Sequence, residues 1–452
     1  MARSALILSL LALLGSSASA ETHSRAVRGV LLITIDALRA DHVGAYGDAV
    51  ATPNLDALAR DSVVLEHATT PVPTTAPAIA SLLTGLHPWR HRVLRNVLTP
   101  LSESSTTLAE VARSHGIHTS AFVGSLMVSD RFGFGQGFEH FEFEPTRAYD
   151  WRHRAQALPE VREQIDRGPF FALARDVTHA AMIQLTRLAG DEPGPFLIWL
   201  HYFDPHTPYA PPARYALSPD APVDLRGKTV PEGIKGEEEL RSLIRGYRGE
   251  VRYIDAEIGR LVGWLRRLDL LDRTAIVFTA DHGEGLGEHG ILEHSSNLSD
   301  ELIHVPLFIR APGLAARRLA GAAQLEDLFP TVLDLLGVHA ESRVDGVSLL
   351  PWLRGEQATS PRFASVGRRR ALQVGPTIFY QQRWPTKWVG VLGQPGRTFR
   401  LDRDPDEAAG QPGAPPPEFL VGRLGVGDPD PPTPLPQNDE ILRALRSLGY
   451  VE

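Results

Sequence analysis

The sequence predicts an α/β fold: a three-layer sandwich whose largely parallel central sheet is covered by helices, plus a smaller C-terminal subdomain. Short apolar runs, each of strand length, alternate with stretches of helical spacing. That alternation is typical of parallel sheets with helices on both faces. A shift in composition after about residue 355 marks the subdomain, which we expect to begin near residue 360.

Five apolar runs are the predicted core strands, at 30–35, 120–123, 196–200, 275–278 and 305–309. Pro306 suggests that the last of them begins there or lies at an edge, because proline cannot donate to a strand ladder. Helical spacing predicts helices at 108–115, 240–268 and 325–336. The Pro- and Gly-rich stretch 410–436 is predicted to be loop or an extended arm, and 440–451 a short helix.

The composition excludes several classes of protein. The chain has 452 residues, a formal net charge of -8 and no cysteine. Without cysteine there is no disulfide scaffold, no thiolate zinc site, no iron–sulfur cluster and no thiol nucleophile. Net acidity without a basic block argues against a nucleic-acid partner. The composition does not predict an oligomeric state.

Residues 1–20 have the pattern of a secretory signal peptide. Arg3 precedes an apolar run at 5–14, and small residues end at Ala20. The run is shorter than the roughly 20 residues of a spanning helix. We therefore expect an exported protein, periplasmic or secreted, with no transmembrane segment in the mature chain. The alternative is an uncleaved N-terminal anchor.

Polar residues follow three of the predicted strands directly. Asp36 follows the first, the segment 201–206 follows the third, and Asp281 with His282 follows the fourth. Ligands of α/β sheets bind beyond the carboxyl ends of the strands. One Asp–His pair would be weak evidence, because Asp is a common turn residue. Recurrence at three strand ends favours a functional site.

The residue types at these ends suit a transition metal. Asp36, Asp281 and His282 offer two carboxylates and one imidazole, which favours zinc or manganese over calcium, an ion that prefers oxygen ligands alone. We expect one divalent metal ion. A second is possible, since further ligands are available from Asp204, His206, His289 and His294.

Thr75 is the candidate nucleophile. Pro77 fits the first turn of a helix and Gly85 fits its end. Thr75 then stands at the helix N-terminus, where an anion is favoured. Metal coordination would lower the pKa of its hydroxyl. The alternative is that Thr75 is only a helix cap.

Several segments resemble motifs of the sulfatase family, a branch of the alkaline phosphatase superfamily of metal-dependent ester hydrolases. They occur in the family's order between residues 28 and 410, at 35–47, 75–85, 205–209, 281–284, 287–290, 327–331, 345–349 and 401–407. The catalytic domain is expected at 28–359, and the C-terminal subdomain and tail at 360–452.

The resemblance implies a role for each matching residue. The metal ligands would be Asp36, Thr75, Asp281 and His282, with Thr75 also the catalytic nucleophile. His206 and His294 would be catalytic and would contact the substrate, as would His289. Arg39 would be structural or would pair with a nearby carboxylate.

The sequence departs from the pattern of members that hydrolyse sulfate esters. Those members carry a Cys or Ser that becomes formylglycine, followed four residues later by Arg; here the positions hold Thr75 and Ile79. Threonine cannot become formylglycine, because its β-carbon carries a methyl group. Residue 37 is Ala where many sulfatases have a second Asp. These departures favour phosphate mono- or diesters of a small molecule, lipid or glycan.

Three alternatives stay open at this point. One is a true sulfatase that acts without formylglycine, and another is a non-catalytic exported binding protein. The third is transfer from a lipid headgroup rather than hydrolysis.

Overall fold

The computed structural model describes residues 27–47, 51–96, 99–146, 170–190, 194–294, 297–357, 365–370, 377–383, 385–391, 395–404 and 407–413. The predicted signal peptide and the predicted helix at 440–451 lie outside these residues. Among the described residues, no helix is both long and apolar enough to cross a bilayer.

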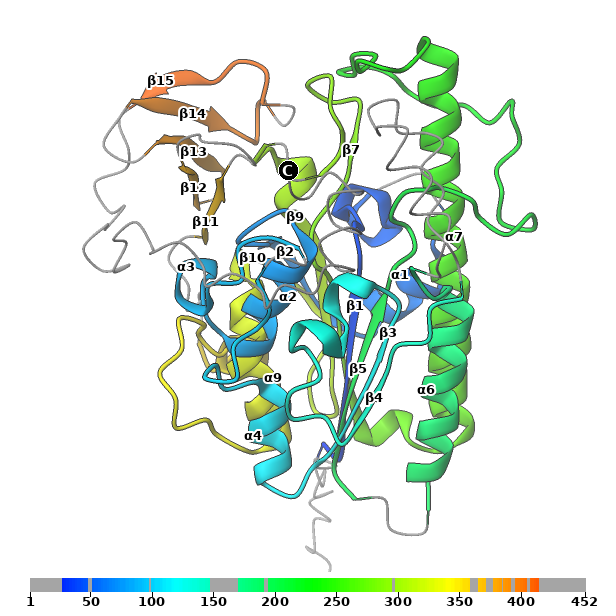
Figure 1. Ribbon diagram of the computed structural model, residues 1–452, viewed down its shortest axis with the longest axis vertical. Coiled ribbons are helices and arrows are strands. Elements are labelled where there is room, and N and C mark those ends of the chain that lie inside the picture. The colour runs from blue at the N-terminus through cyan, green and yellow to red at the C-terminus, as the bar shows by residue number, and fades with distance from the viewer. Residues whose placement is uncertain are drawn as a thin grey trace, which may run out of the picture.

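The core is an eight-stranded sheet (Figure 1). Its order is β10 (Arg317–Gln324), β2 (Val63–Thr69), β9 (His304–Arg310), β6 (Thr274–Ala280), β1 (Gly29–Ile35), β5 (Phe196–Tyr202), β3 (His118–Val123) and β4 (His140–Glu142). Only β9 runs against its neighbours, and the other pairs are parallel. The largely parallel sheet and its five predicted strands are confirmed, and β2, β4 and β10 are additional.

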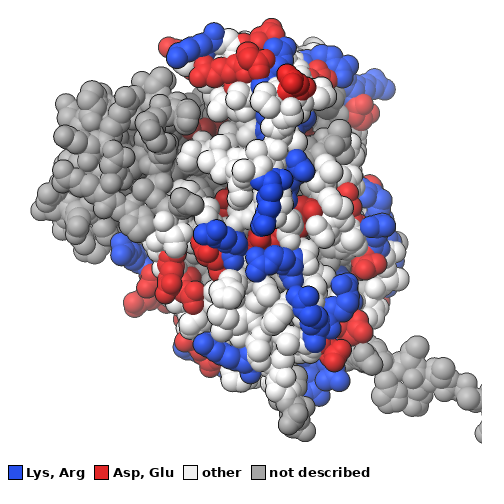
Figure 2. Space-filling view, turned by 90° about the vertical axis from the view of Figure 1, so that its right-hand side faces the viewer, with Lys and Arg blue, Asp and Glu red and all other residues white. Residues whose placement is uncertain are grey.

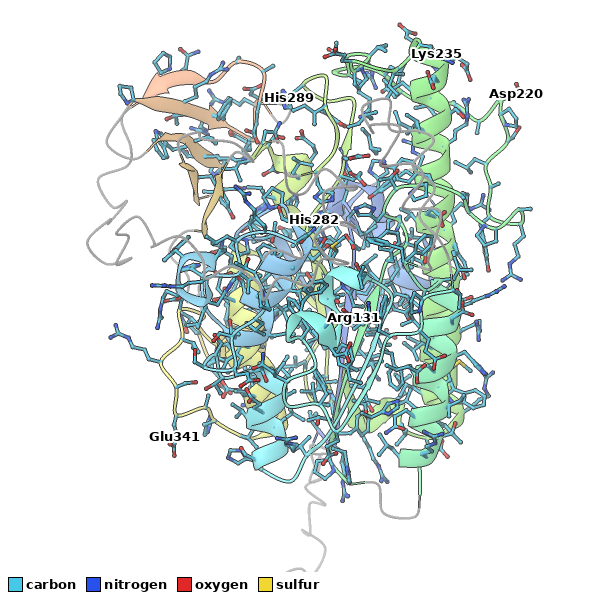
Figure 3. All side chains as sticks on the ribbon, viewed as in Figure 1. Arg131, Asp220, Lys235, His282, His289 and Glu341 are labelled. Carbon is cyan, nitrogen blue, oxygen red and sulfur yellow. The ribbon has the colours of Figure 1, made fainter. Side chains whose placement is uncertain are left out.

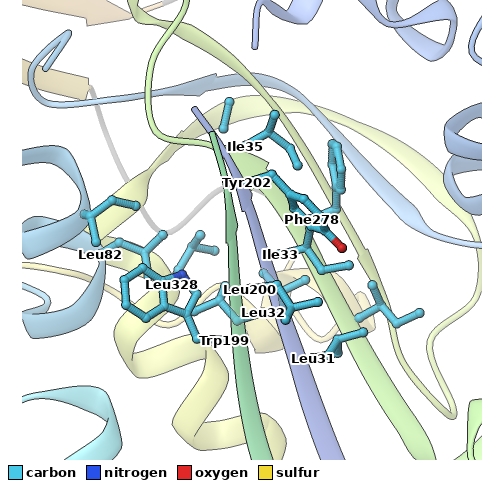
Figure 4. Packing of buried hydrophobic residues seen from close by; sticks show 14 of the residues in the cluster. Leu31, Leu32, Ile33, Ile35, Leu82, Trp199, Leu200, Tyr202, Phe278 and Leu328 are labelled. Carbon is cyan, nitrogen blue, oxygen red and sulfur yellow. The ribbon is translucent and has the colours of Figure 1, made fainter. Parts of the chain in front are cut away.

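The central strands are buried over their whole length, which explains their continuous apolar sequence. Side chains alternate between the two faces of the sheet (Figure 4). Trp199 lies on the face covered by Leu82 and Leu328. Tyr202 lies on the opposite face, where its hydroxyl is 2.9 Å from that of Thr178.

Helices cover both faces (Figure 1). One layer contains α2 (Thr75–Thr84), α4 (Leu108–Ser114) and α9 (Leu328–Leu336), and the other contains α1 (Pro53–Arg60), α6 (Ala174–Leu188) and α7 (Glu237–Arg267). Shorter helices are α3 (Pro88–His91), α8 (Asp300–Ile303) and α10 (Leu350–Arg354). The three predicted helices are thus present, although 325–327 is a 3-10 turn before α9. Figure 2 shows basic and acidic side chains interspersed on the face that lies to the right in Figure 1, where α6 and α7 are.

The C-terminal subdomain is a five-stranded antiparallel sheet of β11 (Ser365–Arg370), β12 (Thr377–Arg383), β13 (Thr386–Val391), β14 (Gly396–Arg400) and β15 (Gln411–Gly413). The smaller C-terminal unit is therefore confirmed. Of the stretch predicted as loop or extended arm from residue 410, the described part is extended, because Gln411–Gly413 forms β15 and pairs with β14. The indole of Trp388 also donates a hydrogen bond to the carbonyl of Gly413, at 3.3 Å. A separate hairpin joins β7 (Gly285–Leu286) to β8 (Leu292–Glu293).

Candidate metal and nucleophile site

The metal-ligand candidates on β1 and β6 meet at one edge of the sheet. The two strands are parallel neighbours with Ile35 opposite Ala280, so Asp36 and Asp281 leave the sheet at the same level. Ligand atoms of Asp36, Asp281 and His282 all lie within 4.8 Å of one another, and all three residues are buried. His282 is labelled at this edge in Figure 3. The three residues that the sequence predicted to share a metal do come together.

The three residues include carboxylate oxygens that are available to coordinate a cation. Within the described part of the chain, both oxygens of Asp36 and Oδ2 of Asp281 are buried without a hydrogen-bond partner. The other oxygen of Asp281 accepts from the backbone N–H groups of Ala37 and His282, at 3.1 and 2.7 Å, which fixes the carboxylate. Orphaned carboxylate oxygens are costly unless a proton or cation compensates them. These residues fit a divalent metal ion.

The imidazole of His282 is oriented as a ligand. Its Nδ1 lies 2.8 Å from the carbonyl oxygen of Gly283, which can only accept, so Nδ1 carries the hydrogen. The lone pair of Nε2 then faces Asp281 Oδ2 at 3.4 Å and Asp36 Oδ1 at 3.6 Å. Burial lowers the pKa of His282 to about 4, which keeps the ring neutral. A neutral imidazole held through its other nitrogen is the form that binds metals.

The two carboxyl groups oppose each other's ionisation. Burial, and then the charge of Asp36, raise the pKa of Asp281 well above its ordinary value. Burial also disfavours the Asp36 anion, but the imidazoles of His206, His201 and His282 together lower its pKa. Two adjacent buried carboxylates can both be charged when a divalent cation lies between them.

Thr75 lies beside this trio. It is the first residue of α2, and Gly85 ends the helix in a left-handed conformation with φ of 68°, as predicted. The hydroxyl oxygen of Thr75 is 3.3 Å from Nε2 of His282, and the residue is buried. The capping position belongs to Thr74, so Thr75 is not the helix cap. Its hydroxyl is directed to the metal-ligand candidates instead.

His206 and His294 form a pair, and His294 lies next to His282. Their Nε2 atoms are 3.0 Å apart, and the ring of His294 lies 4.2 Å from that of His282, centroid to centroid. Nδ1 of His206 faces the carbonyl of Thr207 at 2.7 Å, and Nδ1 of His294 faces that of Pro73 at 3.2 Å. Carbonyls only accept, so each Nδ1 carries a hydrogen, and the Nε2–Nε2 contact needs one more. The Nε2 atoms therefore face each other, so that one ring can hold a hydrogen that the other accepts.

The other predicted ligands lie elsewhere. His289 is at the tip of the β7–β8 hairpin, away from His282 in Figure 3, and its Nε2 is 3.7 Å from Glu301. Asp204 accepts the backbone N–H of Ala174, and burial raises its pKa to about 7. Among the described residues, Asp36, Asp281 and His282 are the only group of three or more side chains that could hold a metal ion. Substrate contact by His289 and a second metal both stay predictions.

Arg39 has the structural role expected of it. It is buried, and its guanidinium binds Asp41 at 2.6 Å and Glu288 at 2.9 Å. Ile79, where the sulfatase pattern has Arg, is fully buried in the hydrophobic core.

His201 is a site residue that the sequence reasoning did not select. It is fully buried on β5, its Nδ1 is 2.9 Å from the hydroxyl of Thr34, and its Nε2 is 3.7 Å from Asp36. A signal was present, because His201 directly follows the predicted strand 196–200, and a buried imidazole needs a polar partner. The partner itself is visible only in the strand register. The register places His201 opposite Thr34, which lies two residues before Asp36.

Carboxylates, an imidazole and a helix-borne hydroxyl thus gather at the carboxyl ends of adjacent parallel strands. Such a fold and site are those of an α/β protein with a candidate metal centre at the carboxyl ends of its parallel strands. The chain belongs to the Sulfatase family, whose sequence model matches residues 28–338. This confirms the family expected from the motifs.

The proteins similar to this chain include a sulfatase, a phosphonate monoester hydrolase and a multifunctional member of the alkaline phosphatase superfamily. The chain is 30% identical over 399 residues to the multifunctional alkaline phosphatase superfamily protein PehA of Trinickia caryophylli, covering 72% of this chain and 77% of that one. It is 27% identical to the choline-sulfatase of Rhizobium meliloti, covering 84% and 81%. Among solved structures, the phosphonate monoester hydrolase of Agrobacterium radiobacter is 25% identical with a TM-score of 0.70, covering 85% of this chain and 91% of that one.

Proposed function

We propose that this protein hydrolyses phosphate mono- or diesters, with Thr75 as nucleophile beside a divalent metal ion held by Asp36, Asp281, His282 and Thr75 itself. The observation that carries the proposal is the 3.3 Å contact between the Thr75 hydroxyl and Nε2 of His282. It directs a hydroxyl, in the position of the formylglycine precursor, toward two carboxylates with orphaned oxygens.

The bound metal would act as a Lewis acid that lowers the pKa of the Thr75 hydroxyl and offsets the negative charge of the ester. Zinc or manganese suits the mixed oxygen and nitrogen ligands. His282 keeps its hydrogen on Nδ1, so that the lone pair of Nε2 stays directed into the site. Asp281 keeps its orientation through the backbone N–H groups of Ala37 and His282.

The chain's own residues then perform the substitution at phosphorus. Thr75 Oγ1 loses its proton to water and forms a bond to phosphorus, while the bond from phosphorus to the ester oxygen breaks. The His206–His294 pair holds a hydrogen between two Nε2 atoms and gives it to the departing oxygen. In the second half, water attacks phosphorus and its proton returns to the histidine pair. The bond from Thr75 to phosphorus then breaks, and Oγ1 takes back a proton from water.

The residues Thr75 and Ile79 of the nucleophile motif favour a phosphate ester over a sulfate ester as substrate. An alkoxide that hydrolyses a sulfate ester would form a threonine sulfate, and the family's sulfate chemistry uses formylglycine, which Thr75 cannot provide. Ile79 lies in the hydrophobic core and donates no hydrogen bond to an anion. Sulfate-ester hydrolysis is the second candidate, since relatives include a choline-sulfatase.

A substrate panel tests the proposal. Purified protein is assayed with 4-nitrophenyl phosphate, bis-4-nitrophenyl phosphate, a phenylphosphonate monoester and 4-nitrophenyl sulfate, with zinc, manganese or calcium supplied separately. We expect turnover of the phosphorus esters with zinc or manganese, little with calcium, and loss of turnover in Thr75→Ala. Faster turnover of the sulfate ester, or full activity in Thr75→Ala, would contradict the proposal.

A further inference from the structure

The C-terminal sheet contacts α8, the short helix that follows the loop of His282 and His294. Lys387 on β13 is fully buried, and its Nζ lies 2.6 Å from Oε1 of Glu407 and 3.9 Å from Oδ1 of Asp300. The same Glu407 oxygen accepts the backbone N–H of Asp300, at 2.8 Å. The first residue of α8 is therefore held by an ion pair whose two members both come from the C-terminal subdomain.

The other side of α8 supports a metal-ligand candidate. The backbone N–H of Gly283 donates to the carbonyl of Leu302 at 2.9 Å. A Cβ atom at position 283 would lie 1.9 Å from the carbonyl oxygen of Glu301, so the backbone at Gly283 packs directly on the helix. The carbonyl of Gly283 in turn accepts Nδ1–H of His282, which directs Nε2 into the metal site. A shift of α8 would therefore move the group that orients this imidazole.

A second contact reaches the segment before the nucleophile. The hydroxyl of Tyr380 on β12 donates to the carbonyl of Thr70 at 2.6 Å, and its ring belongs to a small apolar cluster with Leu302 and Ile303. The N–H of Thr70 bonds to the carbonyl of Ile303 at 2.9 Å. The C-terminal sheet thus contacts both the helix behind His282 and the chain that leads to Thr75.

We propose that the Lys387–Glu407 pair is a positioning element of the metal site, which fixes α8 and, through Gly283, the imidazole of His282. This rests on the proposed metal site. Both residues lie beyond residue 338, where the match to the family model ends. A buried ion pair contributes little stability compared with apolar residues of the same volume. Partners that orient a metal ligand influence metal affinity strongly.

Two variants of the full chain test this. Lys387→Met removes the charge at similar length, and Lys387→Met combined with Glu407→Leu replaces the pair without leaving a buried charge unpaired. Arg400→Met is the control, because Arg400 and Asp402 form an exposed ion pair on the same sheet, at 2.9 Å. Dissociation constants for Mn²⁺ and Zn²⁺ are measured by titration calorimetry at a temperature where circular dichroism shows every variant to be folded.

We expect metal affinity to fall roughly 10- to 100-fold in both Lys387 variants, and less than about 2-fold in Arg400→Met. If Lys387→Met does not fold, the double variant carries the test. A double variant with wild-type metal affinity would overturn the inference, even if its thermal midpoint fell, because the pair would then act on stability alone. If the wild-type protein itself binds neither metal, the proposed function fails. That outcome differs from failure of the inference alone, in which the wild-type protein and the double variant bind metal equally well.

Discussion

The site has two halves that the chain builds in different ways. Asp36, Asp281 and His282 follow two adjacent strands whose register is fixed over seven residue pairs, and the three are buried. His206 and His294 come from longer connections and are positioned mainly by each other and by the carbonyls of Thr207 and Pro73. Strand register therefore sets the metal half, and contacts between loops set the histidine half. Substitutions in the metal half should leave the fold intact but weaken metal binding. Substitutions in the histidine half should lower kcat without changing metal affinity.

The largest effect is expected in the metal half. Asp281→Asn keeps an oxygen that can accept from Ala37 and His282 but removes the second carboxylate. We expect metal affinity to fall by at least about 100-fold, and turnover with it. The metal-free protein should become more stable, because the ionisation of Asp36 is no longer opposed by a second buried carboxyl group. Calorimetric metal titration and urea unfolding of the metal-free protein measure both, and unchanged metal affinity would contradict the assignment.

An intermediate effect is expected in the histidine half. His294→Gln removes the proton donor while the metal half stays intact, so kcat should fall about 10²- to 10⁴-fold with metal affinity nearly unchanged. The loss should be smaller for a 4-nitrophenyl ester than for an alkyl ester, because a good leaving group needs little protonation. Equal losses on both esters would show that His294 does not protonate the leaving group.

The smallest effect is expected at His289, which pairs with Glu301 rather than with the histidine pair. We expect His289→Ala to change kcat/KM by less than about 3-fold, as for most substitutions away from a site. Steady-state kinetics on the same two esters measures it. A loss as large as that of His294→Gln would instead support the predicted contact of His289 with the substrate.

The same contrast explains what the sequence could predict. Continuous apolar runs identified β1, β5 and β6, and residues that follow neighbouring parallel strands must meet, so Asp36 and Asp281 could be paired. Strand β2 was missed because Glu66 and His67 interrupt its apolar pattern. His201 was not selected, because a histidine's partner depends on strand register, which the local sequence does not contain. Likewise, nothing local to Lys387 indicates that its partners are Glu407 and Asp300.

The most direct measurement of the central claim is capture of the nucleophile. The metal-loaded protein is mixed with bis-4-nitrophenyl phosphate, quenched in acid within a turnover, digested and examined by mass spectrometry. The account predicts a phosphoryl group, with or without its remaining ester, on Thr75 of the peptide that spans α2, increased in His294→Gln if the second step is slowed. A phosphorylated residue other than Thr75, or single-turnover hydrolysis at full rate by Thr75→Ala, would contradict it.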